Sequence, residues 1–300
     1  MADVQNERTY DSYIKEFMGI CSEQNVVKFI NGLYGESLPL DSEVTRLETE
    51  THNQGEERRS DFMLKINHRV FHIEVESSDD DGDMILRMFE YGFRGALMHG
   101  RTKDSLTLRF PDPIVLFLRS NEKTPAEFTV NLEFSNNGKY NYSIPVKKLA
   151  DYTPDTLVEN KLYALSLFYP MKYEELLRKK HTDDDESNFL NEIISIIDMI
   201  NAEKEKSEIS SAEADLILEG LEDILQRVLS KSEILNREGV DGLMENIRKK
   251  YAFERLNWKE EGREEGRRDA AREMKRDNLP LDTIQRYTRL SAEEIQALQP

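Results

Sequence analysis

Hydrophobic and polar residues alternate in two short runs between Arg58 and Glu76, and the runs meet at Asn67 and His68. A period of two over so few residues is typical of β-strands. Asn tolerates the positive φ angle that a two-residue hairpin turn requires. We therefore predict a β-hairpin whose turn lies at Asn67–His68.

The register of this hairpin follows by counting outward from the turn. Asp61 then faces Glu74, and Glu76 is next on the same face. Opposed residues have Cβ atoms about 4.5–5.5 Å apart, so like charges repel there unless a cation such as Mg²⁺ binds between them. The pairing indicates either a metal site or an ordinary sheet face with solvated or Arg- and Lys-paired carboxylates. His72 shares this face, as a metal neighbour or as a partly buried imidazole. The other face is apolar, with Phe62, Leu64, Ile66, Phe71, Ile73 and Val75.

Apolar spacing in the rest of the first half predicts an α/β domain. Residues 10–34 have helical periodicity, and residues 52–57 form a polar loop. A strong turn signal at residues 136–138 joins two alternating runs, and residues 113–118 form a continuous apolar run typical of a buried strand. We expect a sheet of five or six strands, which includes residues 43–49, 105–110, 113–118, 128–134 and 140–146.

A helix over residues 84–98 follows the hairpin. Its apolar residues are Ile85, Met88, Phe89, Phe93, Ala96 and Leu97, while Arg87, Tyr91 and Arg94 form a separate stripe. Two guanidinium groups beside the carboxylates are suited to binding a phosphate bidentately. A structural salt bridge from Arg87 to Glu74 or Glu76 explains the same residues equally well. Asp11, in the first helix, either joins the carboxylate cluster or interacts with the helix macrodipole.

The second half is helical from residue 154 onward. Residues 189–200 and 216–229 predict an antiparallel helix pair, which offers an interaction surface or a dimer contact, so a homo-oligomer stays open. The acidic run at residues 181–186 is interpreted as a solvated helix start in preference to a second metal site. Residues 259–277 predict an exposed connector, and residues 280–298 predict two short helices, the second capped by Ser291. We divide the chain at residues 1–150, 151–257 and 258–300.

Composition restricts the possible partners. The 300 residues include 41 Lys and Arg against 59 Asp and Glu, a net charge of −18, so DNA must bind through a local basic surface or a bridging metal. Cys21 is the only cysteine, which excludes an intramolecular disulfide and a cysteine zinc site. The sequence contains neither a signal-peptide pattern nor an apolar run of about 20 residues, so we expect a cytoplasmic protein without a membrane partner.

Three motifs together resemble a nuclease family. An Asp, a hairpin and a Glu-x-(Lys/Gln/Glu) triplet look like the PD-(D/E)XK nuclease core. More narrowly, residues 58–61, 72–77 and 84–91 resemble the Rpn family of recombination-promoting nucleases, which are often described as transposases. Residues 10–15 and 262–266 are similar to the opening helix and the charged tail of that family.

The resemblance implies a Mg²⁺- or Mn²⁺-dependent DNA endonuclease with a mixed sheet flanked by helices in residues 1–150. Asp61, Glu74 and Glu76 would bind the metal, and Arg87, Tyr91 and Arg94 would contact substrate. The sequence departs from the superfamily pattern at Glu76, where Lys is usual and Gln is frequent in this family. In one interpretation, Glu76 is a further metal ligand, and Arg87 or Lys65 supplies the positive side chain that Lys usually provides. In the other, the chain is a catalytically weakened nuclease fold that acts as a binding or regulatory module.

Overall fold

The chain forms two compact units, Met1–Asn236 and Arg237–Pro300, and each is described by itself. The predicted divisions at residues 150 and 257 remain predictions. The computed structural model describes residues 10–47, 50–53, 56–59, 62–77, 83–97, 104–178, 183–230, 267–268, 270–272, 274–276, 279–288 and 290–298.

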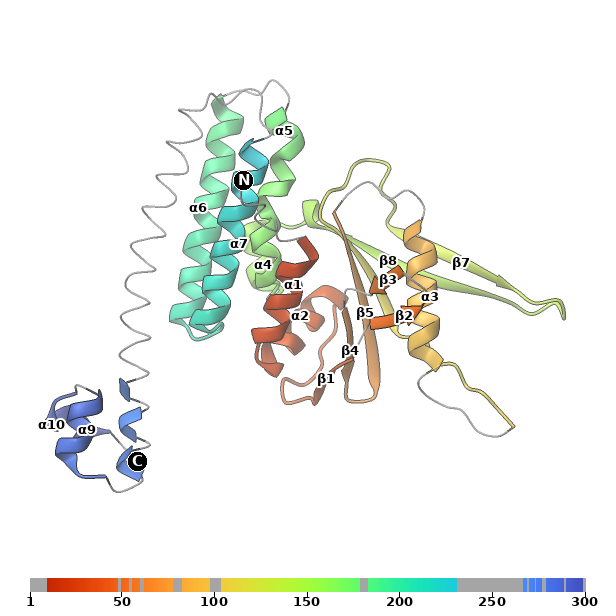
Figure 1. Ribbon diagram of the computed structural model, residues 1–300. Coiled ribbons are helices and arrows are strands. Elements are labelled where there is room, and N and C mark those ends of the chain that lie inside the picture. The colour runs from red at the N-terminus through yellow and green to blue at the C-terminus, as the bar shows by residue number, and fades with distance from the viewer. Residues whose placement is uncertain are drawn as a thin grey trace, which may run out of the picture. The chain divides into compact units, whose positions relative to one another are not determined.

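A six-stranded mixed sheet is the centre of the first unit (Figure 1). Its strand order is β1-β4-β5-β6-β8-β7, in which β5 and β8 run parallel to β6 and the other neighbouring pairs are antiparallel. The expectation of an α/β fold with five or six strands is confirmed. The strands are β1 (Val44–Arg46), β4 (Phe62–Ile66), β5 (Arg69–Glu76), β6 (Asp112–Phe117), β7 (Glu127–Glu133) and β8 (Lys139–Lys148).

The β4–β5 hairpin has the predicted turn and register. Asn67 has a φ of 53°, and Phe62 pairs with Ile73 while Ile66 pairs with Arg69. The Asn67 side chain also donates to Ser42 and accepts from the Glu43 backbone N–H, so the turn is tied to the segment that enters β1. The second predicted hairpin, between β7 and β8, is confirmed as well.

Helices cover both faces of the sheet. On one side lies α3 (Asp83–Leu97), whose Met84 and Met88 pack on Val115 of β6 and Ile144 of β8. On the other side lie α1 (Tyr10–Ile20) and α2 (Glu23–Tyr34) (Figure 1). The Tyr34 hydroxyl donates to backbone carbonyl oxygens on β5 and next to it on β6, and burial raises the pKa of this tyrosine. These contacts fix α2 against the central strands.

Two predictions about continuous elements were wrong. Residues 10–34 form two helices, because Ser22 takes an extended conformation and caps α2 by accepting from the Asn25 backbone N–H. Residues 105–110 contribute only a single bridge residue, Leu106. Phe110 packs against the rings of Phe89 and Tyr142 instead of extending a strand.

The predicted polar loop at residues 52–57 also differs. Residues 52–53 and 56–57 belong to a small antiparallel ribbon of β2 (Glu50–Asn53) and β3 (Glu56–Arg59), with Thr51 paired to Arg58, and residues 54–55 lie outside the described part. Pairing of strands satisfies the backbone N–H and C=O groups of polar and apolar residues alike. Hydrophobic periodicity therefore does not reveal such a ribbon.

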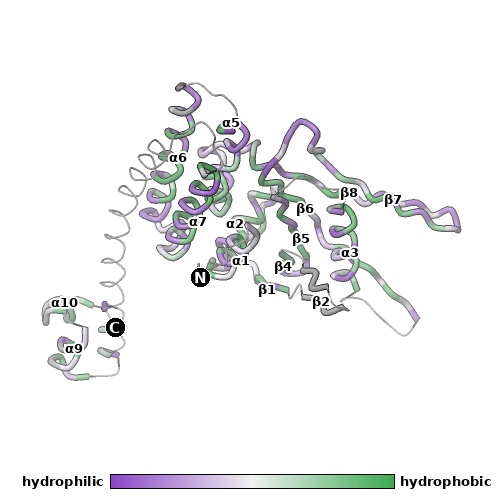
Figure 2. Tube along the Cα trace, turned by 45° about the horizontal axis from the view of Figure 1, so that its top comes forward, coloured by the Kyte–Doolittle hydropathy of each residue, from purple (hydrophilic) through white to green (hydrophobic). Residues whose placement is uncertain are grey.

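The helical half of the first unit packs on α1. The Tyr13 hydroxyl of α1 donates to Asp223 of α7, and a Cβ added at Gly220 of α7 would lie 3.2 Å from the Tyr13 ring. Figure 1 shows the expected pair of α6 and α7 side by side, and Figure 2 shows hydrophobic and hydrophilic residues alternating along α7. The elements are η1 (Leu149–Asp151), α4 (Pro154–Glu159), η2 (Tyr163–Tyr173), α5 (Glu174–Arg178), α6 (Asp183–Glu205) and α7 (Ser211–Ser230).

The second unit contains the two predicted short helices, α9 (Leu281–Thr288) and α10 (Ala292–Ala297). Ser291 and Glu294 form the expected capping box at the start of α10. The helices dock through a small apolar core of Ala271, Ile284, Leu290 and Ile295, with Met274 and Leu298 packed against it. Of the predicted connector, residues 259–266 lie outside the described part. Among the described helices of the whole chain, none has the length and apolar character needed to cross a bilayer.

Candidate acidic site on β5

Three polar residues lie on one face of β5, the strand between β4 and β6. His72, Glu74 and Glu76 alternate with apolar residues, so their side chains point to the same side of the sheet. Their parallel partners on β6 include Val115 and Phe117, which pack under α3. His72, Glu74 and Glu76 together form the β5 column. This column lies between the sheet and α3.

Exposure increases along this column toward the end of β5. The side chains of His72 and Glu74 are 0% and 2% exposed, and that of Glu76 is 12% exposed. Burying a carboxylate costs free energy unless hydrogen bonds or a cation compensate. The face that carries Glu74 is therefore a partly enclosed site, and the alternative of carboxylates solvated on an open sheet face does not describe it.

His72 is the hydrogen-bond partner of Glu74. Its Nε2 lies 3.1 Å from Oε1 of Glu74, and the imidazole ring stands edge-on to the Tyr91 ring with the centroids 6.2 Å apart. The His72 Nδ1 atom is buried and has no hydrogen-bond partner among the described residues. The His72 imidazole therefore orients one oxygen of Glu74 from inside the protein.

Arg87 of α3 pairs with Glu76 at the more open end of the column. A terminal guanidinium nitrogen of Arg87 lies 2.8 Å from Glu76 Oε2. This contact is the salt bridge to Glu76 that the sequence left open for Arg87. Arg94 pairs instead with Glu90, one helical turn earlier.

The orientation of α3 differs from the prediction. Tyr91 was placed on a stripe away from the apolar face, but it is buried, whereas Phe93 and Leu97 are exposed. Gly95 explains the difference, because it lets the helix approach β4 closely. A Cβ added at Gly95 would lie 2.9 Å from the Met63 sulfur on β4. The close approach turns Tyr91 toward His72.

Two predicted site residues lie outside what the structure describes. Asp61 is outside the described residues, and so is the side chain of Asp11. Within the described ranges, no three His, Cys, Asp or Glu side chains form a group that could hold a metal ion. A Mg²⁺ or Mn²⁺ site built from Asp61, Glu74 and Glu76 therefore stays a prediction. The described pair fits a hard cation in donor type, since carboxylate oxygens are the ligands such ions prefer.

Arg119, which sequence reasoning did not select, joins three elements at the end of β6. Its guanidinium group donates to the Ser77 carbonyl oxygen, to Glu174 of α5 and to the Tyr10 hydroxyl of α1. The backbone N–H of Leu118 donates to the carbonyl oxygen of Glu76 over 2.8 Å. Arg119 thereby fixes the backbone directly after β5. The only signal in the sequence is a basic residue directly after a buried apolar run.

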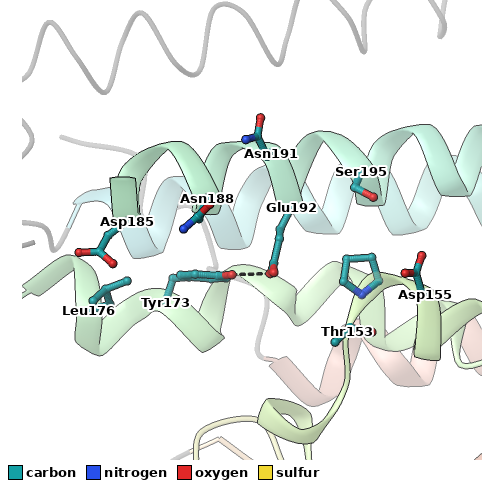
Figure 3. A pocket seen from close by; sticks show the side chains of 10 residues that line it. Thr153, Asp155, Tyr173, Leu176, Asp185, Asn188, Asn191, Glu192 and Ser195 are labelled. Atoms are coloured by element: carbon teal, nitrogen blue, oxygen red, sulfur yellow. Dashed lines mark hydrogen bonds between the residues drawn. The ribbon is translucent and has the colours of Figure 1, made fainter. Parts of the chain in front are cut away.

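Two of the pockets formed by described residues lie outside the column. A pocket of 380 Å³ adjoins Arg119. A second pocket, of 590 Å³, is formed by α4, the end of η2, α5 and α6, and Figure 3 shows Glu192 of α6 directed toward Tyr173 of η2. Glu192 accepts hydrogen bonds from the hydroxyls of Tyr169 and Tyr173, and burial together with this carboxylate raises the pKa of both tyrosines. The acidic run before Glu192 is the start of α6, as expected.

Comparison with protein-family models, with curated proteins and with solved structures finds no match for this chain. The resemblance to the Rpn family therefore stays an expectation that depends on the motifs in residues 58–91. The case for a function depends on the chemistry of the β5 column.

Proposed function

We propose that this chain is a metal-dependent DNA endonuclease of the PD-(D/E)XK type, similar to Rpn nucleases, which hydrolyses phosphodiester bonds. In this proposal Asp61 and Glu74 bind Mg²⁺ or Mn²⁺, Glu76 assists as a further ligand, and Arg87 contacts phosphate. The single observation that carries the proposal is the burial of Glu74 on a central strand, in line with Glu76. A buried, oriented carboxylate beside a second one costs stability and is typical of functional sites.

The hairpin register supports the same assignment. Phe62 pairs with Ile73, and continuation of that register by one residue pair is what the proposal requires of Asp61 and Glu74. The mixed sheet flanked by helices is the architecture that the resemblance implies. The proposed site lies toward the carboxyl end of β5, which runs parallel to β6, and ligands of open α/β sheets bind at such ends.

The described residues have separate roles in this scheme. His72 forms a hydrogen bond with one oxygen of Glu74 from the buried side, and this contact fixes the orientation of the carboxylate. Arg87 is held beside Glu76 and supplies the positive charge that Lys supplies in the usual superfamily pattern. Mg²⁺, when bound, polarises the phosphodiester and lowers the pKa of water so that a nucleophile forms near neutral pH.

A second candidate is a nuclease fold with a weakened site that acts as a binding or regulatory module. The pairing of Glu76 with Arg87 favours it, because Arg87 balances the charge of the residue that stands where Lys is usual. This candidate predicts DNA or protein binding without hydrolysis.

Plasmid cleavage separates the two candidates. The wild type, Asp61→Ala and Glu74→Gln are incubated with supercoiled plasmid in Mg²⁺ and in Mn²⁺, with Glu90→Gln as a control on the same side of the sheet. Glu74→Gln keeps an acceptor oxygen for His72, so we expect this variant to fold. Circular dichroism checks that it does. We expect cleavage by the wild type and Glu90→Gln alone. Equal background in all four proteins refutes the nuclease and leaves the binding module.

A further inference from the structure

The pocket of 380 Å³ beside Arg119 combines position and charge in a way that the proposed site does not use. It opens at the carboxyl end of β6, and its walls come from the end of β6, from η1 and η2, and from α5. Three cationic side chains, those of Arg119, Lys172 and Arg178, line it together with Glu174 and Glu175. In a chain with a net charge of −18, this is a local surplus of positive charge.

The charges around the pocket are arranged and not merely close. Glu174 is buried and accepts hydrogen bonds from Arg119 and from Arg178, with the nitrogens 2.5 and 2.7 Å from its oxygens. One carboxylate thus holds two guanidinium groups in place. Because two positive groups share one negative group, the three together keep a positive charge. Arginine groups fixed in this way suit bidentate binding of phosphate oxygens.

Each cation also keeps N–H groups for a ligand. Among the described residues, Arg178 directs one N–H at Glu174, although a guanidinium carries five donors. Within the same part of the chain, Lys172 donates to the Tyr152 carbonyl oxygen and to the Tyr169 hydroxyl, which leaves one of its three N–H groups. Burial lowers the pKa of Lys172, which an anion in the pocket would offset. Lys172 and Arg178 can therefore donate further hydrogen bonds to an anionic ligand without losing their contacts within the protein.

Hydrogen bonds connect residues that line the pocket to the end of the β5 column. Arg119 holds the Ser77 carbonyl oxygen, and Leu118, another lining residue, donates its backbone N–H to Glu76. A group in the pocket and a group at Glu76 thus lie at the same end of the parallel pair β5 and β6. This connection points to a ligand that extends from one to the other.

We propose that the Arg119–Lys172–Arg178 pocket binds a backbone phosphate of the DNA strand whose cleavage we assign to the β5 column, so the inference rests on the proposed function. The pocket supplies the local basic surface that an acidic chain needs to bind a polyanion. It positions the strand and takes no part in the hydrolysis.

Salt-dependent DNA binding tests this inference. The dissociation constant of a fluorescein-labelled duplex is measured by anisotropy across a salt series, with Ca²⁺ replacing Mg²⁺. Arg178→Gln and Lys172→Gln are compared with Lys139→Gln, which removes the same charge from an exposed ion pair with Glu133 at the β7–β8 turn. Loss of one phosphate contact lowers the slope of log affinity against log salt by about 0.9, and we expect this shift in both pocket variants only. Slopes equal to that of Lys139→Gln overturn the inference.

A second measurement keeps the two proposals separate. Melting of the wild type and of Arg178→Gln is followed with and without inorganic phosphate, and circular dichroism checks that both are folded. We expect phosphate to raise the melting temperature of the wild type and not of Arg178→Gln. Equal shifts overturn the pocket assignment even if the wild type cleaves DNA. An Arg178-dependent shift in a protein that binds no duplex overturns the nucleic-acid part, and with it the proposed nuclease.

Discussion

The ion pair between Glu76 and Arg87 gives a direct way to ask whether the β5 column binds a metal. Glu76→Gln removes the carboxylate charge, and Arg87→Met removes the cation while keeping much of the side-chain length. Measured singly and together, the two changes form a double-mutant cycle that isolates the interaction between the residues from their other contacts.

The structure sets the expected size of this interaction. The nitrogen and oxygen are 2.8 Å apart, and the side chains are 36% and 12% exposed. Fully exposed pairs contribute about 0.2–1 kcal/mol, whereas breaking a fully buried pair costs about 3–5 kcal/mol. A partly exposed pair whose arginine reaches solvent belongs near the lower range, so we expect a coupling free energy of about 1 kcal/mol without metal. In a unit of this size, that corresponds to roughly 2–4 °C in melting temperature.

Urea denaturation of the four proteins measures the coupling, first without metal and then in Mn²⁺. If Glu76 is a ligand, its negative charge is shared with the cation in the folded state, and the coupling to Arg87 falls toward zero. The pair of Glu90 and Arg94 on the same helix serves as a matched control, because it is a partly exposed i,i+4 pair, and helical pairs of this spacing contribute about 0.3–0.5 kcal/mol. Its coupling should not respond to Mn²⁺.

Two results would contradict this reasoning. A coupling that stays near 1 kcal/mol in saturating Mn²⁺ shows that Glu76 keeps its partner and is not a ligand. A coupling of zero without metal shows that the ion pair does not contribute to the folded state in solution. A response to Mn²⁺ at Glu90 and Arg94 as well would indicate a general ionic effect.

Three further predictions concern stability and reactivity. Gly32→Ala should destabilise strongly in urea denaturation, because a backbone carbonyl oxygen lies 1.8 Å from the added Cβ, whereas Gly19→Ala meets nothing within 4 Å and should be neutral or stabilising. The Cys21 thiol should react with a disulfide reagent only on unfolding, since burial, with a nearby carboxylate, raises its pKa. A hydrogen bond from Arg69 lowers the pKa of Glu36 below its usual 4.5, so the stability from this pair is present above that pH and is lost as pH falls through the folded pKa. Glu36→Gln should flatten the acid limb of the stability profile, and an unchanged limb would contradict it.

Local sequence signals predicted the parts of the fold that depend on a few neighbouring residues. Asn67 adopts the positive φ of the β4–β5 turn and Asn137 that of the β7–β8 turn, and Ser291 caps α10. The hairpin register followed from the turn because side chains alternate with a period of two. The same alternation placed His72, Glu74 and Glu76 on one face. In contrast, the break at Ser22 had a local capping signal that helical periodicity obscured.

Tertiary structure alone decided what surrounds that face. Whether α3 turns Tyr91 or Phe93 toward the sheet depends on how closely Gly95 approaches β4, which periodicity along one helix does not encode. Arg119 meets Tyr10 and Glu174 only because the chain brings three distant segments to the end of β6. Turns and register are properties of neighbouring residues, whereas burial and the pairing of charges arise when separate elements pack together. The sequence by itself therefore determined which acids share a strand, and the packed structure decided that Glu74 is enclosed and that Arg87 pairs with Glu76.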